Sequence, residues 1–216
     1  MLAVLAAAPS VLAPLTRPVL GVYGMPLSWG DMAGFVTGVV CVWLTARANI
    51  WNFPVGIANS AILGLVFFEQ RLFADASLQV VFILLSVQGL LAWLEQGQAS
   101  ESAPVRRSSG RELGLLALSV VVVMPGLCWL LGRLNGSAPL VDALVASLSL
   151  AAQWLLNRRM LETWGFWIVV DLISIPLYIS RDLPLIAGLY VIFLGLCCQG
   201  FLRWRLLVPA KTWSAA

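Results

Sequence analysis

One stretch of the sequence combines aromatic rings with a single carboxylate, a set of side chains suited to holding a flat cation. At 100° per residue, Trp164, Trp167, Asp171 and Tyr178 fall within about 60° of one another on one helix face. The rings can stack on an aromatic cation and attract it, while the carboxylate neutralises its charge. The alternative is a helix–helix seam in which the tryptophans pack and Asp171 bonds to a neighbour. We favour binding, because an acid in mid-membrane costs about 2.5–3.5 kcal/mol and a seam does not require one.

Other polar side chains within apolar runs can complete a cavity around such a ligand. They are Asn59, Ser60, Gln79, Gln153, Asn157 and Tyr190. Amides suit a carboxamide or the hydroxyl groups of a ribose. Taken singly, each amide is as able to bridge two helices as to contact a ligand.

The residue types on which most catalysis depends are missing. The chain has no histidine, one lysine (Lys211) and no P-loop motif. Its four cysteines lie in apolar runs without CxxC spacing, which indicates buried thiols and neither a disulfide nor a metal site. An intramembrane enzyme would need paired acids, a Ser/Lys pair or histidine ligands, and a purely structural scaffold has no use for a buried acid. We therefore expect no enzyme and no cofactor, and the lack of a basic tract argues against nucleic-acid binding.

The composition is that of an integral membrane protein. Of 216 residues, 61% are hydrophobic and 11% charged, and the mean hydropathy is +0.94. Soluble domains carry about 25% charged residues, and a helix needs about 20 apolar residues to cross a bilayer. Seven spans are predicted, at roughly 31–46, 53–69, 76–94, 112–131, 140–156, 164–180 and 185–203.

The distribution of arginine predicts an orientation. With seven spans, nine Lys and Arg residues fall on one side and four on the other, which places the N-terminus outside and the C-terminus in the cytoplasm. We expect residues 1–30 to be an extracellular or interfacial lead-in, since they lack the positive start of a signal peptide. Trp43, Trp93, Trp154 and Trp204 lie near span ends and are predicted to anchor the protein at the membrane interface.

The chain also repeats itself. A shift of 111 residues aligns Asp31–Trp93 with Asp142–Trp204 without a gap, with 16 identities in 63 positions. In this alignment Ser60 corresponds to Asp171 and Gln79 to Tyr190, so the two halves offer different groups at equivalent points. The predicted organisation is a three-helix bundle (31–94), a linker with one transmembrane helix (95–139), a second bundle (140–205) and a cytoplasmic tail (206–216).

The single helix between the copies makes both enter the membrane in the same direction. The predicted fold is thus an all-α membrane protein of seven transmembrane helices in a 3+1+3 parallel repeat, the arrangement of the SWEET sugar carriers. Two such bundles can enclose a site and expose it alternately to the two sides.

Two runs of sequence resemble the PnuC family of vitamin transporters. Ala48–Gly56 (ANIWNFPVG), Arg71–Asp75 (RLFAD) and Gln79 are similar to the first half of that family, and Gln153–Asp171 resembles its WxxWxxx[N/D] helix. The resemblance covers roughly residues 30–205. It implies a homotrimer in the bacterial inner membrane that takes up nicotinamide riboside for NAD biosynthesis by facilitated diffusion, with trapping by a cytosolic kinase.

The resemblance also implies which residues line the substrate cavity. They are Trp164, Trp167, Asp171 and Gln79, with Trp51, Asn52 and Tyr178 as further transfers. Some nicotinamide riboside members carry Asn where this chain has Asp171. Thiamine, another cationic aromatic vitamin, fits the acid equally well and stays open as the alternative substrate, whereas riboflavin is neutral and larger.

Overall fold

The computed structural model describes residues 15, 17–22, 25–70, 72–99, 105–134 and 138–209. A short antiparallel hairpin of β1 (Pro18–Val22) and β2 (Met25–Ser28) precedes the helices. The seven helices are α3 (Trp29–Ala46), α4 (Asn52–Glu69), α5 (Phe73–Ala99), α6 (Gly110–Arg133), α7 (Pro139–Asn157), α8 (Thr163–Ser180) and α9 (Pro184–Leu207). Most of the predicted lead-in, residues 1–14, and most of the predicted tail, residues 210–216, lie outside the described residues.

Local sequence signals explain where the helices begin. Ser28 and Ser109 each cap a helix through a capping box, in which the serine hydroxyl accepts from the backbone three residues on and an acid bonds back. Pro139 and Pro184 occupy first helical positions, where the missing N–H is not needed. α5 extends beyond its predicted end at residue 94, because the polar residues that follow continue the helix to Ala99.

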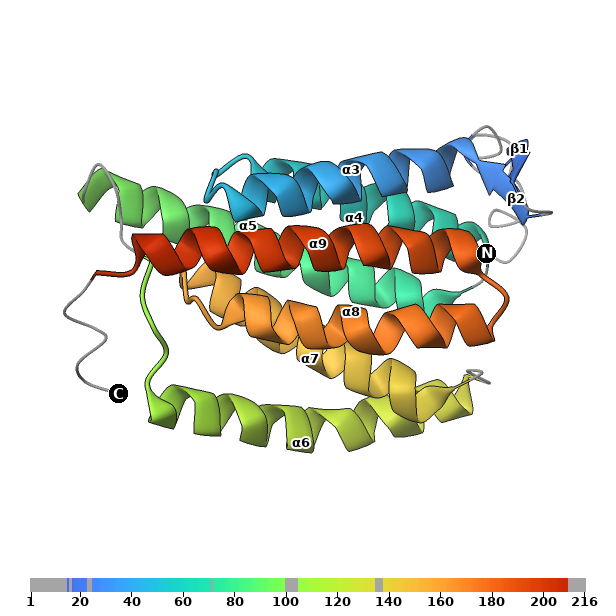
Figure 1. Ribbon diagram of the computed structural model, residues 1–216. Coiled ribbons are helices and arrows are strands. Elements are labelled where there is room, and N and C mark those ends of the chain that lie inside the picture. The colour runs from blue at the N-terminus through green and yellow to red at the C-terminus, as the bar shows by residue number, and fades with distance from the viewer. Residues whose placement is uncertain are drawn as a thin grey trace, which may run out of the picture.

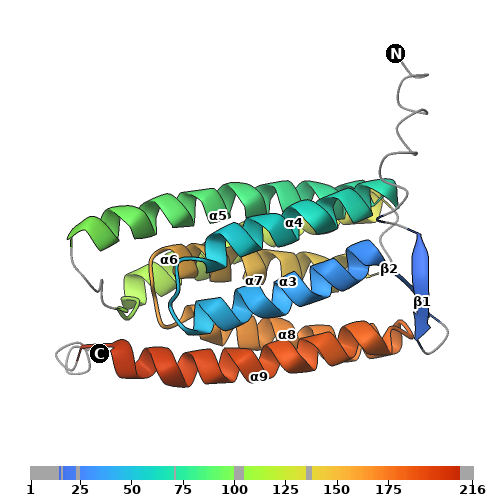
Figure 2. The same ribbon diagram turned by 90° about the horizontal axis from the view of Figure 1, so that it is seen from above.

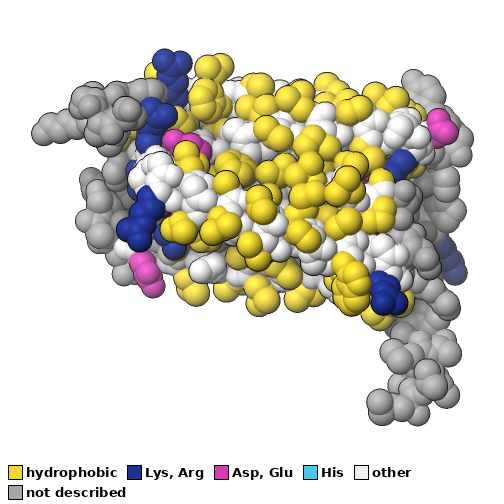
Figure 3. All heavy atoms as spheres, turned by 90° about the horizontal axis from the view of Figure 1, so that it is seen from below, with side chains coloured by type: hydrophobic (Ala, Val, Ile, Leu, Met, Phe, Trp, Pro, Cys, Tyr) yellow, Lys and Arg dark blue, Asp and Glu magenta, His cyan; other side chains and the backbone are white. Residues whose placement is uncertain are grey.

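All seven described helices are long and apolar enough to cross a membrane. Their outer surfaces carry large exposed apolar side chains, among them Leu84, Leu118, Val121 and Leu202. In the space-filling view, hydrophobic side chains cover the middle of the bundle, and Lys and Arg gather toward its ends (Figure 3). This pattern fits lipid and not water, so the chain is a multi-pass membrane protein.

The helices form two groups of three with one helix outside them. In each group consecutive helices pack on one another, α3 on α4 on α5 and α7 on α8 on α9. The groups meet where α3 packs on α9 and α5 on α7, while α6 packs on α7 alone among the stronger contacts (Figure 1). Both α3 and α7 begin at the end of the bundle that carries the hairpin (Figures 1 and 2).

Several contacts recur at the spacing of 111 residues. The Trp93 indole Nε1 donates to the Leu156 carbonyl oxygen at 3.3 Å, and the Trp204 Nε1 donates to the Thr45 carbonyl oxygen at 3.1 Å. Each of these bonds joins one group to the other, and each donor and each acceptor is 111 residues from its counterpart. Such pairing is expected of the predicted repeat and supports it.

These indoles correct one expectation. Trp93 and Trp204 are 1% and 0% exposed, so neither ring can contact lipid as an interface anchor. Trp93 packs edge-on against Phe53 at 5.0 Å, and Trp204 packs edge-on against Trp164 at 5.5 Å. Because each indole also donates a hydrogen bond to the opposite group, both are parts of the joint between the two groups. Trp43 differs, because its ring is 38% exposed and lies beneath the Arg47 guanidinium at 3.8 Å.

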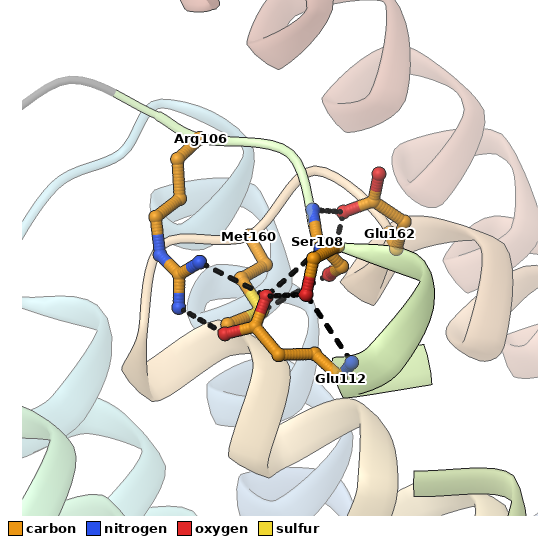
Figure 4. A network of polar contacts seen from close by, with 6 residues as sticks. Arg106, Ser108, Glu112, Met160 and Glu162 are labelled. Atoms are coloured by element: carbon orange, nitrogen blue, oxygen red, sulfur yellow. Dashed lines mark hydrogen bonds and ion pairs between the residues drawn. The ribbon is translucent and has the colours of Figure 1, made fainter. Parts of the chain in front are cut away.

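The segment before α6 is fastened to the loop between α7 and α8. The Arg106 N–H donates to the Arg159 carbonyl at 3.0 Å, and the Leu161 N–H donates to the Arg106 carbonyl at 2.9 Å. The Ser108 N–H and hydroxyl both donate to Glu162 Oε2 at 2.8 Å (Figure 4). We call residues 105–109 with 158–162 the linker clamp. It fixes the start of α6 to the second group of helices.

Candidate functional site

A cavity of about 270 Å³ lies between the two groups of helices. Every helix except α6 contributes to its lining, and the first and second groups face each other across it. Its polar lining residues are Thr45, Asn52, Asn59, Ser60, Gln79, Ser86, Ser149, Gln153, Asp171 and Tyr190. The volume lies near the lower end of the roughly 300–1,000 Å³ of small-molecule sites. A cavity with convergent polar groups, among helices that cross a membrane, is suited to holding a small solute.

Asp171 is the one carboxylate in this lining. Its side chain is on α8 and is 3% exposed, and the Cys197 thiol of α9 lies beside it in the lining. Its carboxylate oxygen Oδ2 is buried and has no hydrogen-bond partner. Among the described lining residues there is no Lys, Arg or His to balance the charge. A buried acid without a counter-charge is unfavourable, so this oxygen is the strongest candidate for a ligand contact.

The two tryptophans of α8 differ in how tightly their rings are packed. Trp164 is 1% exposed and held edge-on by Trp204, and a Cβ at Gly200 would lie only 2.5 Å from its ring. Trp167 is only half-buried and packs against the core from the cavity side. Trp164 is thus a fixed wall whose Nε1 lacks a partner, and Trp167 is the ring better able to stack on a ligand.

The amide side chains also divide into two kinds. Asn59 donates both N–H groups inside its own bundle, to the Gly34 carbonyl at 2.7 Å and to the Thr37 hydroxyl at 2.8 Å. Asn52 donates to the Asn49 carbonyl at 2.7 Å. Gln79 lies in the lining without such a bond to any described residue, so its amide is available to a ligand.

The structure gathers eight of the ten predicted site residues around the cavity. These are Asn52, Asn59, Ser60, Gln79, Trp164, Trp167, Asp171 and Tyr190. Tyr178 is not in the lining, because its ring stacks on Tyr190 at 5.2 Å. Trp51 is 64% exposed just before α4 and also lies outside the lining. For these two residues the structure offers no contact with the cavity.

Sequence reasoning missed much of the lining from the first group, including Gly38, Gly56, Phe82 and Ser86. The repeat could have found them, because nine pairs of lining residues are 111 apart. The pairs are Gly38/Ser149, Val42/Gln153, Thr45/Leu156, Gly56/Trp167, Asn59/Val170, Ser60/Asp171, Gln79/Tyr190, Phe82/Phe193 and Ser86/Cys197. At two of these pairs a small residue of the first group, Gly56 or Ser60, corresponds to Trp167 or Asp171 of the second, so the two sides of the lining differ in size and charge.

The fold and the cavity define an integral membrane carrier of small solutes. A family model described as nicotinamide mononucleotide transporter matches residues 28–206. The chain belongs to this family, that of the PnuC transporters.

Named relatives extend the comparison. The chain is 25% identical over 211 residues to the nicotinamide riboside transporter PnuC of Escherichia coli, covering 86% of this chain and 88% of that one. It is 26% identical to the PnuC of Neisseria mucosa, over 85% of this chain and 74% of the relative. It is also 25% identical to the riboflavin/roseoflavin transporter RibM of Streptomyces davaonensis, over 82% and 85%. All three are named transporters, in line with the expectation that this chain is not an enzyme.

A solved structure has the same fold. The crystal structure of the vitamin B3 transporter PnuC superposes with a TM-score of 0.68 at 23% identity, over 83% of this chain and 81% of that one. The prediction of an all-α membrane protein with seven transmembrane helices is confirmed.

Proposed function

We propose that this protein carries nicotinamide riboside across the bacterial inner membrane by facilitated diffusion. The observation that carries the proposal is the buried, unpaired Oδ2 of Asp171 in a cavity lined by Trp167. Nicotinamide riboside is a permanently cationic pyridinium, so it can lie on the indole and offer the acid its missing counter-charge. Gln79 is placed to bond the carboxamide or a ribose hydroxyl.

The lining favours the riboside over the mononucleotide for which the family model is named. A phosphate needs Lys, Arg or a cluster of backbone N–H groups, and the described lining holds no cationic side chain and one acid. Phosphate and carboxylate would repel each other in a setting that screens charge poorly. The same argument supports trapping, because a substrate phosphorylated by a cytosolic kinase could not return through this cavity.

The two helix groups suggest the transport cycle. The cavity lies at their joint, so rocking one group against the other would open it to one side and then to the other. The excess of arginine at the loops Arg47–Trp51 and Arg158–Glu162 favours placing that end, and the C-terminus, in the cytoplasm. A homotrimer is expected from the family resemblance, and α6, which has Leu116 as its only buried residue, offers an apolar face for it.

Thiamine is the second candidate, since it is also a cationic aromatic vitamin. Nothing in the lining favours it over nicotinamide riboside. Riboflavin, although a relative carries it in its name, lacks the positive charge that Asp171 calls for.

The proposal is tested with purified protein in liposomes. We expect uptake of labelled nicotinamide riboside without ATP or an imposed ion gradient, and no uptake of nicotinamide mononucleotide. Thiamine uptake without riboside uptake would reassign the substrate, and uptake of riboflavin alone would contradict the role given to Asp171.

The role of the acid is tested by Asp171→Asn. This change removes the counter-charge but keeps the shape, and a hydrogen bond to a charged group is worth about 1.5–3 kcal/mol. We expect binding of nicotinamide riboside, measured by calorimetry, to weaken about tenfold or more, and by more than in Trp164→Phe. Asp75→Asn makes the same change at an exposed acid outside the cavity lining and serves as the control. Equal affinity of wild type and Asp171→Asn would show that the acid only packs.

A further inference from the structure

Two amide side chains of α7 connect the cavity to the backbone of the opposite helix group. Gln153 and Asn157 lie one turn apart and are 8% and 5% exposed. The Asn157 Nδ2 donates to the Leu85 carbonyl oxygen of α5 at 2.8 Å, and the Gln153 Nε2 donates to the Asn157 Oδ1 at 3.2 Å. Gln153 belongs to the cavity lining and Asn157 does not. Asn157 therefore links the lining residue to a fixed backbone group.

The backbone sets the direction of both hydrogen bonds. A carbonyl oxygen can only accept, so the part of the Asn157 amide that meets Leu85 must be its –NH2 group. The Asn157 oxygen then meets Gln153 and can also only accept, so Gln153 must turn its own –NH2 group toward Asn157. The atom of the Gln153 amide that is left for the cavity is its oxygen, Oε1.

Close packing against α5 holds Asn157 in this orientation. A Cβ at Gly89 would collide with the Asn157 amide oxygen, so this side chain fits only because position 89 is a glycine. Turning the amide over would bring its oxygen against the Leu85 carbonyl oxygen, and two buried acceptors without a hydrogen between them are unfavourable. The residues 111 positions earlier than Gln153 and Asn157 are Val42 and Ala46, so the first helix group has no such pair.

Other hydroxyl groups of the lining do not donate to the Gln153 oxygen. The Ser149 hydroxyl, one turn earlier on α7, donates to the Val145 carbonyl oxygen at 2.8 Å. The Thr45 hydroxyl of α3 donates to the Cys41 carbonyl oxygen at 2.9 Å. Among the residues that the structure describes, no donor is hydrogen-bonded to Gln153 Oε1. An acceptor in so buried a side chain is unfavourable when unpaired, so a ligand that donates to it is favoured.

We propose that Asn157 fixes Gln153 as a hydrogen-bond acceptor, and that the carrier uses this oxygen to select substrates that bear an N–H or O–H donor. Nicotinamide riboside carries such donors in its carboxamide –NH2 group and its ribose hydroxyls. A ligand with a methyl group or a hydrogen atom in place of that donor leaves the Gln153 oxygen unpaired. Gln153 is thus a specificity-determining residue, and Asn157 is the positioning residue behind it. The inference deepens the proposed function and rests on it, because the donors are those of the riboside.

The experiment measures binding to the purified full chain by calorimetry, with a series of ribosides that all keep the cationic pyridinium ring. Nicotinamide riboside has every donor. Its 3-acetylpyridine analogue has a methyl group in place of the carboxamide –NH2, and each deoxy analogue lacks one ribose hydroxyl. For wild-type protein, we expect the analogue without the donor for Gln153 to bind about fivefold to tenfold more weakly than nicotinamide riboside.

Gln153→Met keeps an unbranched side chain of similar length and removes the acceptor. It should weaken binding of nicotinamide riboside about fivefold to tenfold and leave the affinity for one analogue unchanged, because that analogue already lacks the same hydrogen bond. The unaffected analogue identifies the donor: the acetyl compound indicates the carboxamide, and a deoxy compound indicates the hydroxyl that it lacks. If Gln153→Met changes the affinity for the riboside and for every analogue by the same factor, or changes none, Gln153 only packs and the inference is wrong.

Asn157→Ala tests the positioning role, because it frees the Gln153 amide to turn over. The preference for nicotinamide riboside over the unaffected analogue should fall toward one, whereas a structural defect would weaken both ligands equally and leave the preference unchanged. Ser147→Ala is the control, since Ser147 is a buried residue of α7 outside the lining whose hydroxyl donates to its own helix. The preference should not change in this variant.

The outcomes separate this inference from the proposed function. Binding of nicotinamide riboside with the same preference in wild type, Gln153→Met and Asn157→Ala would overturn the inference alone. If Asn157→Ala does not fold, the ligand series with Gln153→Met still decides whether the oxygen selects the substrate. A wild-type protein that binds neither the riboside nor any analogue would refute both the inference and the proposed function.

Discussion

A single methyl group added at Gly200 tests how tightly the wall of the cavity is held. Gly200 lies on α9 against the face of Trp164, and a Cβ built there would be 2.5 Å from two atoms of the indole. Trp164 cannot retreat easily, because it is 1% exposed and its ring meets Trp204 at 5.5 Å on another side. Gly200→Ala therefore forces the indole or the helix to move.

The size of the effect follows from two opposed terms. Overpacking a dense core costs about 1–3 kcal/mol, and replacing Gly by Ala within a helix returns up to about 1 kcal/mol. A net loss of about 1–2 kcal/mol should lower the Tm by about 2–8 °C for a chain of this length. Because Trp164 also lines the cavity, affinity for nicotinamide riboside should fall in the same variant.

Thermal denaturation in detergent and a binding titration measure both effects, and α9 supplies the control. A methyl group at Gly195 would have no atom within 4 Å, so Gly195→Ala should leave the Tm unchanged or raise it. In a Trp164→Ala background the methyl at Gly200 has room, and its penalty should disappear. Equal Tm values for Gly200→Ala and Gly195→Ala would show that α9 is not closely packed against Trp164.

Four further substitutions probe the joint, the cavity and the linker clamp. Trp93→Phe and Trp204→Phe each remove one hydrogen bond between the helix groups. Each substitution should lower the free energy of unfolding, measured by denaturation, by about 1–3 kcal/mol. An unchanged free energy of unfolding for either variant would contradict the paired joint. Gly38→Ala places a methyl group 3.2 Å from the Phe193 ring in the cavity lining. Calorimetry should therefore show weaker binding of nicotinamide riboside, with little loss of Tm. Unchanged affinity would mean that the ligand does not contact the cavity wall at Gly38. Glu162→Gln weakens the hydrogen bonds from Ser108, because it removes the charge of their acceptor. Amide hydrogen exchange at residues 106–108 should become faster, while affinity for nicotinamide riboside is retained. Unchanged exchange would show that the linker clamp does not need the Glu162 charge.

The helices could be predicted from the sequence because a bilayer demands long apolar runs, and breakers or charges separate those runs here. Observed starts fall within three residues of prediction, as at Gly110 against 112 and Phe73 against 76. The capping serines Ser28 and Ser109 account for two of these starts. The repeat was also visible in sequence, and it explains why the lining comes in pairs.

What the sequence could not reveal is which side of each helix faces lipid. Apolar side chains cover both the outside and the inside of a membrane bundle, so Trp93 and Trp204 could not be told from interface anchors by position alone. The same ambiguity affected Tyr178, which shares a helix face with Asp171 but whose ring stacks on Tyr190. Asp171 itself was found because an acid in an apolar run is costly wherever it faces.

Because of the linker clamp, the molecule consists of two bodies of unequal size. α6 is fastened to the α7–α8 loop through Ser108 and Glu162 and also packs along α7, so four helices form one body and α3–α5 form the other. The chain crosses between these bodies only once, between α5 and residue 105. We expect the larger body to behave as the stationary part and the smaller one as the lever, so that crosslinking α6 to α7 is tolerated whereas crosslinking α3 to α9 arrests turnover.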